Sequence, residues 1–197
     1  MKLSNLILLS IISIAFFYIQ LWDHRIVIPL YLTLLGANVI YATALKNTNM
    51  AHISGFIFLI YSINYMVFKV GLINYVTPED NKLLQGTLIY GTHFIFSLIL
   101  VLVLIFRVQL SRLISKSESI ELTHFDGIFH WIYIYTSIVY LLALVENIAW
   151  SYFDLKSWTL IYDNFEGLIY IAWALCCGAL LTMMICSKKP TNTNELA

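Results

Sequence analysis

The stretches that decide the fold are GIFHWIYIYTSIVYLLALVENIAW, residues 127–150, and SWTLIYDNFEGLIYIAWALCCGALLTMMICS, residues 157–187. Each is mostly apolar and long enough to cross a bilayer, because a spanning α-helix needs about 20 such residues. The second stretch is long enough to tilt or to extend beyond the lipid. Between them lies a short polar connection around Asp154-Leu155-Lys156. The sequence therefore predicts a hairpin of two transmembrane helices in this part of the chain.

The composition extends this interpretation to the whole chain. Of the 197 residues, 60% are hydrophobic and 11% are charged, whereas soluble domains have about 45–50% apolar and about 25% charged residues. Too few polar side chains are present to face water on all sides. The formal net charge is zero, so the sequence indicates neither a basic nucleic-acid-binding surface nor an acidic tail. We predict an all-α, polytopic membrane protein that contacts the lipid bilayer and no nucleic acid.

Six segments qualify as transmembrane helices, and short polar breaks separate them. They cover about residues 4–22, 26–45, 52–75, 84–106, 127–150 and 157–187. We predict one transmembrane domain over residues 1–189 and a polar cytoplasmic tail over residues 190–197. Lys2 and the apolar run after it imitate a signal peptide, but no small-x-small cleavage site follows Trp22. We therefore expect the first segment to be retained as a helix.

The longest connection between the predicted helices runs from Arg107 to Asp126. Arg107, Arg112 and Lys116 are interspersed with apolar residues, so we expect the fourth helix to continue along the membrane surface. Its basic side chains would face solvent or anionic lipid headgroups. Thr123 stands three residues before Asp126, a pattern typical of a helix N-terminus. The fifth helix is therefore expected to begin there.

The distribution of Lys and Arg predicts the orientation, because cytoplasmic loops are enriched in both. With the N-terminus inside, seven basic residues fall on the inner side and three on the outer side. The inner residues are Lys2, Lys46, Arg107, Arg112, Lys116, Lys188 and Lys189, and the outer residues are Arg25, Lys82 and Lys156. We expect both termini in the cytoplasm. The small size and short loops favour a bacterial cytoplasmic (inner) membrane.

Polar side chains gather at one depth of the predicted bundle, in the half nearer its outer face. The acids are Glu146, near the end of the fifth segment, and Asp163 and Glu166, near the start of the sixth. A carboxylate that faces lipid costs about 2.5–3.5 kcal/mol at the midplane, so we expect all three to turn inward and to bind a cation or a proton. The supporting polar residues are Asn64, Lys69, His93, Asn147 and Tyr170.

The same residues also have a structural interpretation, because polar side chains join membrane helices by interhelical hydrogen bonds. Catalytic motifs such as Gly-x-Ser-x-Gly, His-Glu-x-x-His and a phosphate-binding glycine loop are absent from the sequence. Our first functional hypothesis is a small transporter or channel component. The second is a non-catalytic membrane subunit, an assembly, sensing or immunity factor that contacts a second copy or another membrane protein. An intramembrane enzyme is the third.

The histidines and cysteines suggest no cofactor. The sequence has no His-x-x-x-His and no Cys-x-x-Cys-His. His52 and His130 fall near the inner face, and this pair is the one basis for an axially ligated haem. The cysteines Cys176, Cys177 and Cys186 all belong to the last apolar segment, so they make no disulfide framework. We expect neither a metal nor a cofactor.

Overall fold

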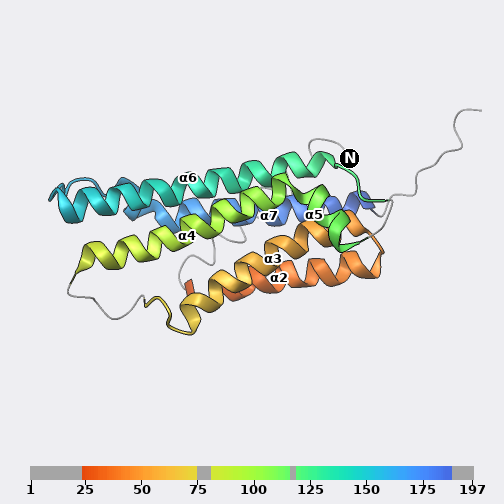
Figure 1. The fold of residues 1–197 in the computed structure, drawn as a ribbon, viewed down its shortest axis with the longest axis horizontal. Coiled ribbons are helices and arrows are strands. Elements are labelled where there is room, and N and C mark those ends of the chain that lie inside the picture. Colours follow the sequence, from red (N-terminus) through yellow and green to blue (C-terminus); the bar gives the residue numbers. More distant parts are fainter. Residues whose placement is uncertain (1–23, 75–80, 116–118, 188–197) are drawn as a thin grey trace, which may run out of the picture.

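The computed structural model describes residues 24–74, 81–115 and 119–187. Within these ranges the chain forms six α-helices and no strand (Figure 1). They are α2 (His24–Ala44), α3 (Thr48–Lys69), α4 (Lys82–Ile105), α5 (Arg107–Ile114), α6 (His124–Tyr152) and α7 (Leu160–Ser187). All but α5 are long and apolar enough to span a membrane, which confirms the predicted all-α, multi-pass class. The helix expected over residues 4–22 and the tail expected over 190–197 lie outside the described residues.

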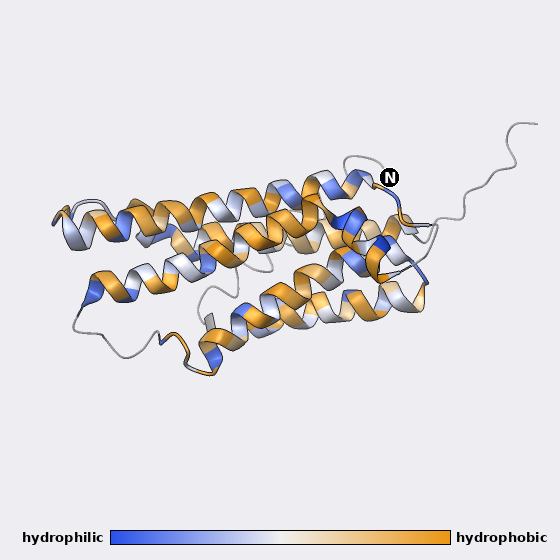
Figure 2. Ribbon diagram, viewed as in Figure 1, coloured by the Kyte–Doolittle hydropathy of each residue, from blue (hydrophilic) through white to orange (hydrophobic). Residues whose placement is uncertain are grey.

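The long helices lie roughly side by side along one axis (Figure 1). α2 and α3 form one hairpin, α6 and α7 form another, and α4 packs along α6. Apolar residues run along the length of these helices, and hydrophilic residues gather toward the two ends of the bundle (Figure 2). This distribution suits a bundle whose middle faces hydrocarbon and whose ends face headgroups and water.

Capping residues set the bounds of α3, which begins four residues before the predicted segment 52–75 and ends six residues before its end. At the start, the Asn47 side chain accepts a hydrogen bond from the backbone N–H of Met50, at 3.1 Å. At the other end, Gly71 has a φ of +80°. The N–H of Gly71 donates to the Phe68 carbonyl and that of Leu72 to the Val67 carbonyl, both at 3.1 Å. This is a Schellman motif, whose left-handed residue is usually glycine.

Aromatic side chains from four helices meet in the core. Tyr31 of α2 and Trp173 of α7 stack with their ring planes 5° apart and their centroids at 4.9 Å. The Tyr31 and Tyr133 hydroxyls are hydrogen bonded at 2.8 Å, and the Tyr133 hydroxyl lies 3.1 Å from the sulfur of Cys176. The Trp173 ring N–H donates to the Tyr61 hydroxyl, at 3.2 Å. Because lipid offers no hydrogen-bond partners, such buried hydroxyls must be satisfied inside the bundle.

Small hydroxyl side chains connect α4 to α6. The Ser97 hydroxyl lies 2.9 Å from the Thr136 hydroxyl and 2.8 Å from that of Ser137, and all three residues are buried. Small residues let two membrane helices approach closely, and their hydroxyls hydrogen bond across the interface. Beyond Ser97, this face of α4 continues with the buried apolar residues Leu100, Val101 and Leu104. The α4–α6 interface is therefore polar at mid-length and dry toward α5.

Candidate functional site

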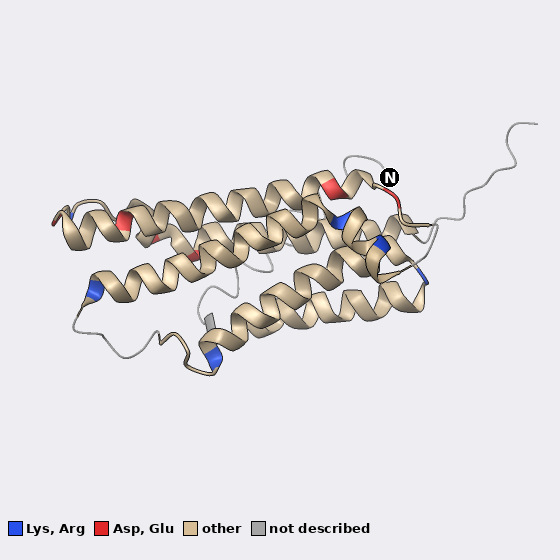
Figure 3. Ribbon diagram, viewed as in Figure 1, with Lys and Arg blue, Asp and Glu red and all other residues tan. Residues whose placement is uncertain are grey.

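The predicted acids lie at one end of the bundle, where α6 ends and α7 begins (Figure 3). We call this the Glu146 end. The Glu146 carboxylate accepts hydrogen bonds from the backbone N–H groups of Ile161, at 3.2 Å, and Tyr162, at 2.7 Å. N–H groups in the first turn of a helix have no intrahelical partner, and a negative charge is favourable there. Glu146 therefore joins the start of α7 to α6.

Asp163 and Glu166 both lie on exposed positions of α7. The Asp163 carboxylate accepts a hydrogen bond from the hydroxyl of Thr159, at 2.8 Å, in the turn that begins the helix. Within the described ranges the ion pairs are Arg107–Asp126 and Lys156–Asp154, so none of the three predicted acids is paired with a basic side chain there. The structure thus places all three near the start of α7, where Glu146 accepts from backbone N–H groups and Asp163 from a hydroxyl.

Glu146→Ala is expected to loosen the first turn of α7, because two N–H groups lose their acceptor. Loss of a helix cap costs about 0.5–2 kcal/mol, so hydrogen exchange at Ile161 and Tyr162 should become about tenfold faster, the equivalent of about 1.4 kcal/mol. Glu166→Ala is the matched control, since Glu166 is exposed on the same helix. Equal exchange rates in the two variants would contradict the capping role. Exchange measured by mass spectrometry in nanodiscs provides the comparison.

Two of the predicted supporting residues lie elsewhere at the Glu146 end. The amide of Asn147 donates to the backbone carbonyl of Leu83, at 3.4 Å, and so connects α6 to the first turn of α4. The Lys69 ammonium donates to the Tyr65 hydroxyl, at 3.2 Å, and lies 5.6 Å from the centre of that ring. Lys69 is exposed and contacts its own helix. Lys69 therefore forms no ion pair with an acid among the described residues.

The structure brings Asn64 and His93 together. The side-chain nitrogen of Asn64 lies 3.0 Å from Nδ1 of His93, which links α3 to α4. The imidazole stacks between two rings, with centroids 4.4 Å from Phe68 and 5.1 Å from Tyr140. The remaining supporting residue, Tyr170, is buried with its ring 5.5 Å from Trp173 and belongs to the aromatic core. Asn64 and His93 thus form an interhelical polar pair at mid-length.

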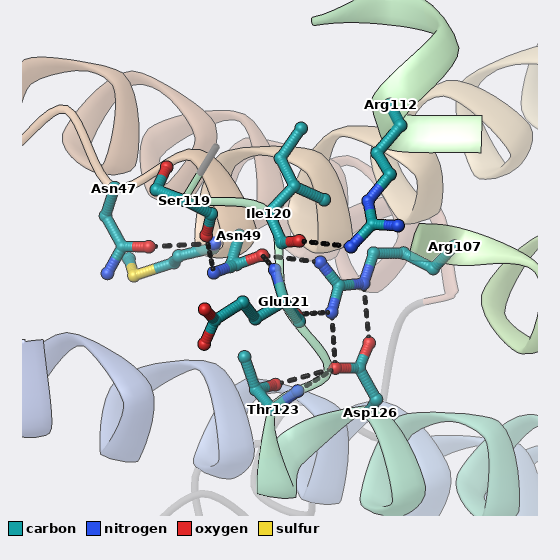
Figure 4. Close-up of polar contacts among 10 residues, drawn as sticks. Asn47, Asn49, Arg107, Arg112, Ser119, Ile120, Glu121, Thr123 and Asp126 are labelled. Atoms are coloured by element: carbon teal, nitrogen blue, oxygen red, sulfur yellow. Dashed lines mark hydrogen bonds and ion pairs between the residues drawn. The ribbon is translucent and has the colours of Figure 1, made fainter. Parts of the chain in front are cut away.

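The most extensive polar cluster is one that the sequence did not predict (Figure 4). Arg107, the first residue of α5, is fully buried. Its Nε donates to Oδ1 of Asp126 at 2.7 Å, its Nη1 to Oδ1 of Asn49 at 2.7 Å, and its Nη2 to the Glu121 carbonyl at 2.6 Å and to Oδ2 of Asp126. We call these four residues the Arg107 clamp. They use four of the five guanidinium N–H groups and join α3, α5 and α6.

The clamp corrects the prediction for this segment. The basic strip at the membrane surface is wrong for Arg107, whose side chain is enclosed, and Lys116 lies outside the described residues. α5 is a separate short helix that follows a break at Phe106, where φ is −92° and ψ is 17°. The predicted start of the fifth helix is confirmed: the Asp126 carboxylate accepts from the N–H of Thr123 at 2.6 Å and from its hydroxyl at 2.8 Å.

The Arg107 clamp holds α3, α5 and α6 together by hydrogen bonds and an ion pair. A buried guanidinium is stable only where acceptors replace its hydration, and here a carboxylate, an amide and a carbonyl do so from the protein itself. Asn49 extends the cluster, because its amide nitrogen donates to the Ser119 carbonyl, at 2.9 Å. The acceptors that surround Arg107 therefore leave little of its hydrogen-bonding capacity for a substrate.

The histidine pair considered for haem is divided between α3 and α6. The His52 ring lies 6.1 Å from that of Phe56, and the His130 ring lies 6.0 Å from that of Trp131. Among the residues that the structure describes, no three His, Cys, Asp or Glu side chains gather closely enough to hold a metal ion. All three cysteines are present as free thiols.

Comparison with protein-family models, with curated protein sequences and with solved structures finds no match. The assignment of the protein to a structural class therefore depends on the properties of its own helices. Five helices long and apolar enough to cross a membrane make the chain a multi-pass membrane protein.

Proposed function

We propose that the chain is a non-catalytic membrane subunit, whose polar side chains inside the bundle hold its helices together. The observation that carries the proposal is that polar side chains of the described helices form hydrogen bonds across helix interfaces at both ends of the bundle and at mid-length. A side chain engaged in this way has lost the hydrogen-bonding capacity that a substrate would use. The sequence ranks transport ahead of a subunit role, and we place the subunit role first because these contacts support it.

Such contacts occur at three levels along the bundle. The Arg107 clamp joins α3, α5 and α6 at one end. At mid-length, Asn64 contacts His93 and Ser97 contacts the α6 hydroxyls. At the Glu146 end, Glu146 and Asn147 reach α7 and α4. Polar contacts of this kind act as glue between membrane helices, so they support a structural role for the residues that the sequence marks as functional.

A transporter or channel component is the second candidate, and one observation favours it. Glu146, Asp163 and Glu166 lie at one end of the bundle with no basic partner among the described residues. Neighbouring carboxylates of this kind attract cations. On this hypothesis the three acids bind a cation or a proton, and the two contacts of Glu146 with backbone N–H groups hold that carboxylate in place.

A flux assay in proteoliposomes separates the two candidates. The subunit role predicts no cation or proton flux above that of empty vesicles under several pH, Na⁺ and K⁺ gradients. It also predicts that Asp163→Asn/Glu166→Gln leaves folding and stability nearly unchanged, because both residues are exposed. The control variant is Asp154→Asn, which alters an exposed acid outside the helices. Wild-type flux that the double variant loses and the control retains would establish transport.

A membrane subunit should also remain bound to its partner protein during purification. We expect a second copy or one membrane protein to remain bound at fixed stoichiometry through mild detergent, in the wild type and in the Asp163→Asn/Glu166→Gln variant alike. Native mass spectrometry measures that stoichiometry. A strictly monomeric protein that drives flux would overturn the subunit proposal.

A further inference from the structure

A small cavity lies at mid-length of the bundle, between α3, α4 and α6. Its lining consists of Ile60, Tyr61, Asn64, His93, Phe96, Ser97 and Tyr140. Five of these seven side chains carry a polar group, whereas the α4–α6 interface becomes apolar toward α5, at Leu100, Val101 and Leu104.

Asn64 is the residue that points to an occupant. Its side chain is 7% exposed, and its Nδ2 contacts Nδ1 of His93. Its Oδ1, however, is buried without a hydrogen-bond partner among the described residues. An unsatisfied buried acceptor costs about 1–3 kcal/mol, and lipid cannot provide a donor in place of water. A donor inside the cavity would remove this cost.

The size of the cavity restricts which donor can occupy it. The cavity volume is about 10 Å³, and one water molecule needs a cavity of about 10–15 Å³. Metabolites and lipid headgroups are far larger. A bare cation would fit, but no carboxylate lines the cavity, so its charge would be buried without compensation.

The hydrogen-bonding pattern of the walls also suits water. An amide nitrogen can only donate, so the 3.0 Å contact between the Asn64 amide nitrogen and Nδ1 of His93 suits the tautomer that carries its proton on Nε2. The Ser97 hydroxyl already contacts Thr136 and Ser137, and the Tyr61 phenol accepts from Trp173. Each hydroxyl oxygen has two acceptor lone pairs, so both keep some capacity to accept, and the Tyr140 phenol both donates and accepts. A buried water typically makes about 3 hydrogen bonds, which Asn64, Tyr140 and one of these hydroxyls can supply. A group that both donates and accepts is therefore the best match.

We propose that this cavity is a binding site for a single water molecule, which donates a hydrogen bond to Oδ1 of Asn64 and bridges α3 to α4 and α6. The water satisfies the one buried acceptor that the Asn64–His93 pair leaves open. The interface of α3 with α4 and α6 then contains one water molecule, whereas the aromatic core and the Leu100–Leu104 part of α4 contain none.

Hydroxyl-radical footprinting of the protein in nanodiscs tests the proposal, because ionised bound water modifies the side chains that surround it. Tyr140 is 4% exposed and lines the cavity, and Tyr133 is fully buried outside it. We expect Tyr140 to be modified several-fold faster than Tyr133. Protection of Tyr140 equal to that of Tyr133 would overturn the proposal.

A variant identifies the acceptor. Asn64→Leu should reduce the modification of Tyr140 to the level of Tyr133. Asn38→Leu is the matched control, because Asn38 is also buried with an unpartnered Oδ1 but does not line the cavity. It should leave Tyr140 unchanged. Where Asn64→Leu fails to fold, the wild-type comparison of Tyr140 with Tyr133 decides.

Exchange of the salt separates water from a cation. Equal modification of Tyr140 in sodium, potassium and choline chloride supports a water molecule. Modification that falls when sodium or potassium replaces choline would show that an ion displaces the solvent and would overturn the assignment to water.

Discussion

Arg107→Leu is expected to destabilise the protein by about 3–5 kcal/mol, the cost of removing one partner from a buried ion pair. The variant leaves the Asp126 carboxylate buried without its counter-ion, and Asn49 and the Glu121 carbonyl lose their donor. For a chain of this size, such a loss lowers the thermal midpoint by roughly 10 °C. Thermal unfolding in nanodiscs, followed by circular dichroism, measures it.

Arg112→Leu is the control for Arg107→Leu. Arg112 belongs to the same helix but is exposed, and it makes one long hydrogen bond, at 3.3 Å, to the Ile120 carbonyl. An exposed charge contributes less than about 1 kcal/mol. The double variant Arg107→Leu/Asp126→Leu should recover part of the stability, since it removes both buried charges. Equal effects of Arg107→Leu and Arg112→Leu would mean that the guanidinium is hydrated and that the clamp does not form.

Gly86→Val is expected to displace the Asn147 side chain, which connects α6 to α4 at the Glu146 end. A Cβ atom at Gly86 would lie 2.5 Å from Cγ and 2.7 Å from Nδ2 of Asn147. The Asn147 side chain must then leave its place and lose its contact with the Leu83 carbonyl. Overpacking of this kind costs about 1–3 kcal/mol. The fall in thermal midpoint measures it.

Gly91→Val provides the matched control, because a Cβ at Gly91 on the same helix meets nothing within 4 Å. Its stability should remain close to that of the wild type. Asn147→Ala added to Gly86→Val should restore part of the loss, since the truncated side chain makes room for the valine. If the addition of Asn147→Ala does not reduce the loss, the contact between Gly86 and Asn147 is not the cause.

Hydropathy predicts the long helices well because the bilayer sets their length. It predicts their ends less well, because ends depend on capping. The segment predicted at 52–75 begins at Thr48 since Asn47 caps it, and it ends at Lys69 since Gly71 adopts the left-handed conformation. Thr123 and Asp126 are the exception, because their local pattern already predicts a helix start.

The polar residues show the limit of sequence reasoning more clearly. The spacing of Asp163 and Glu166 predicts a shared helix face, but the neighbouring helices decide whether that face is enclosed, and here both residues are exposed. Arg107 is the opposite case. Its surroundings along the chain resemble those of the exposed Arg112, and its buried partner lies 19 residues away. The binding of a cation or a proton by the three acids stays a prediction.

The Arg107 clamp also has a consequence for the synthesis of the protein. The ribosome makes Arg107 19 residues before Asp126, a delay of roughly 1–4 s at about 5–20 residues per second. Until Asp126 emerges, the nascent chain carries a cation whose counter-ion does not yet exist, so α3 and α5 cannot close around it without cost. Any chain that stops short of Asp126 keeps that unpaired charge.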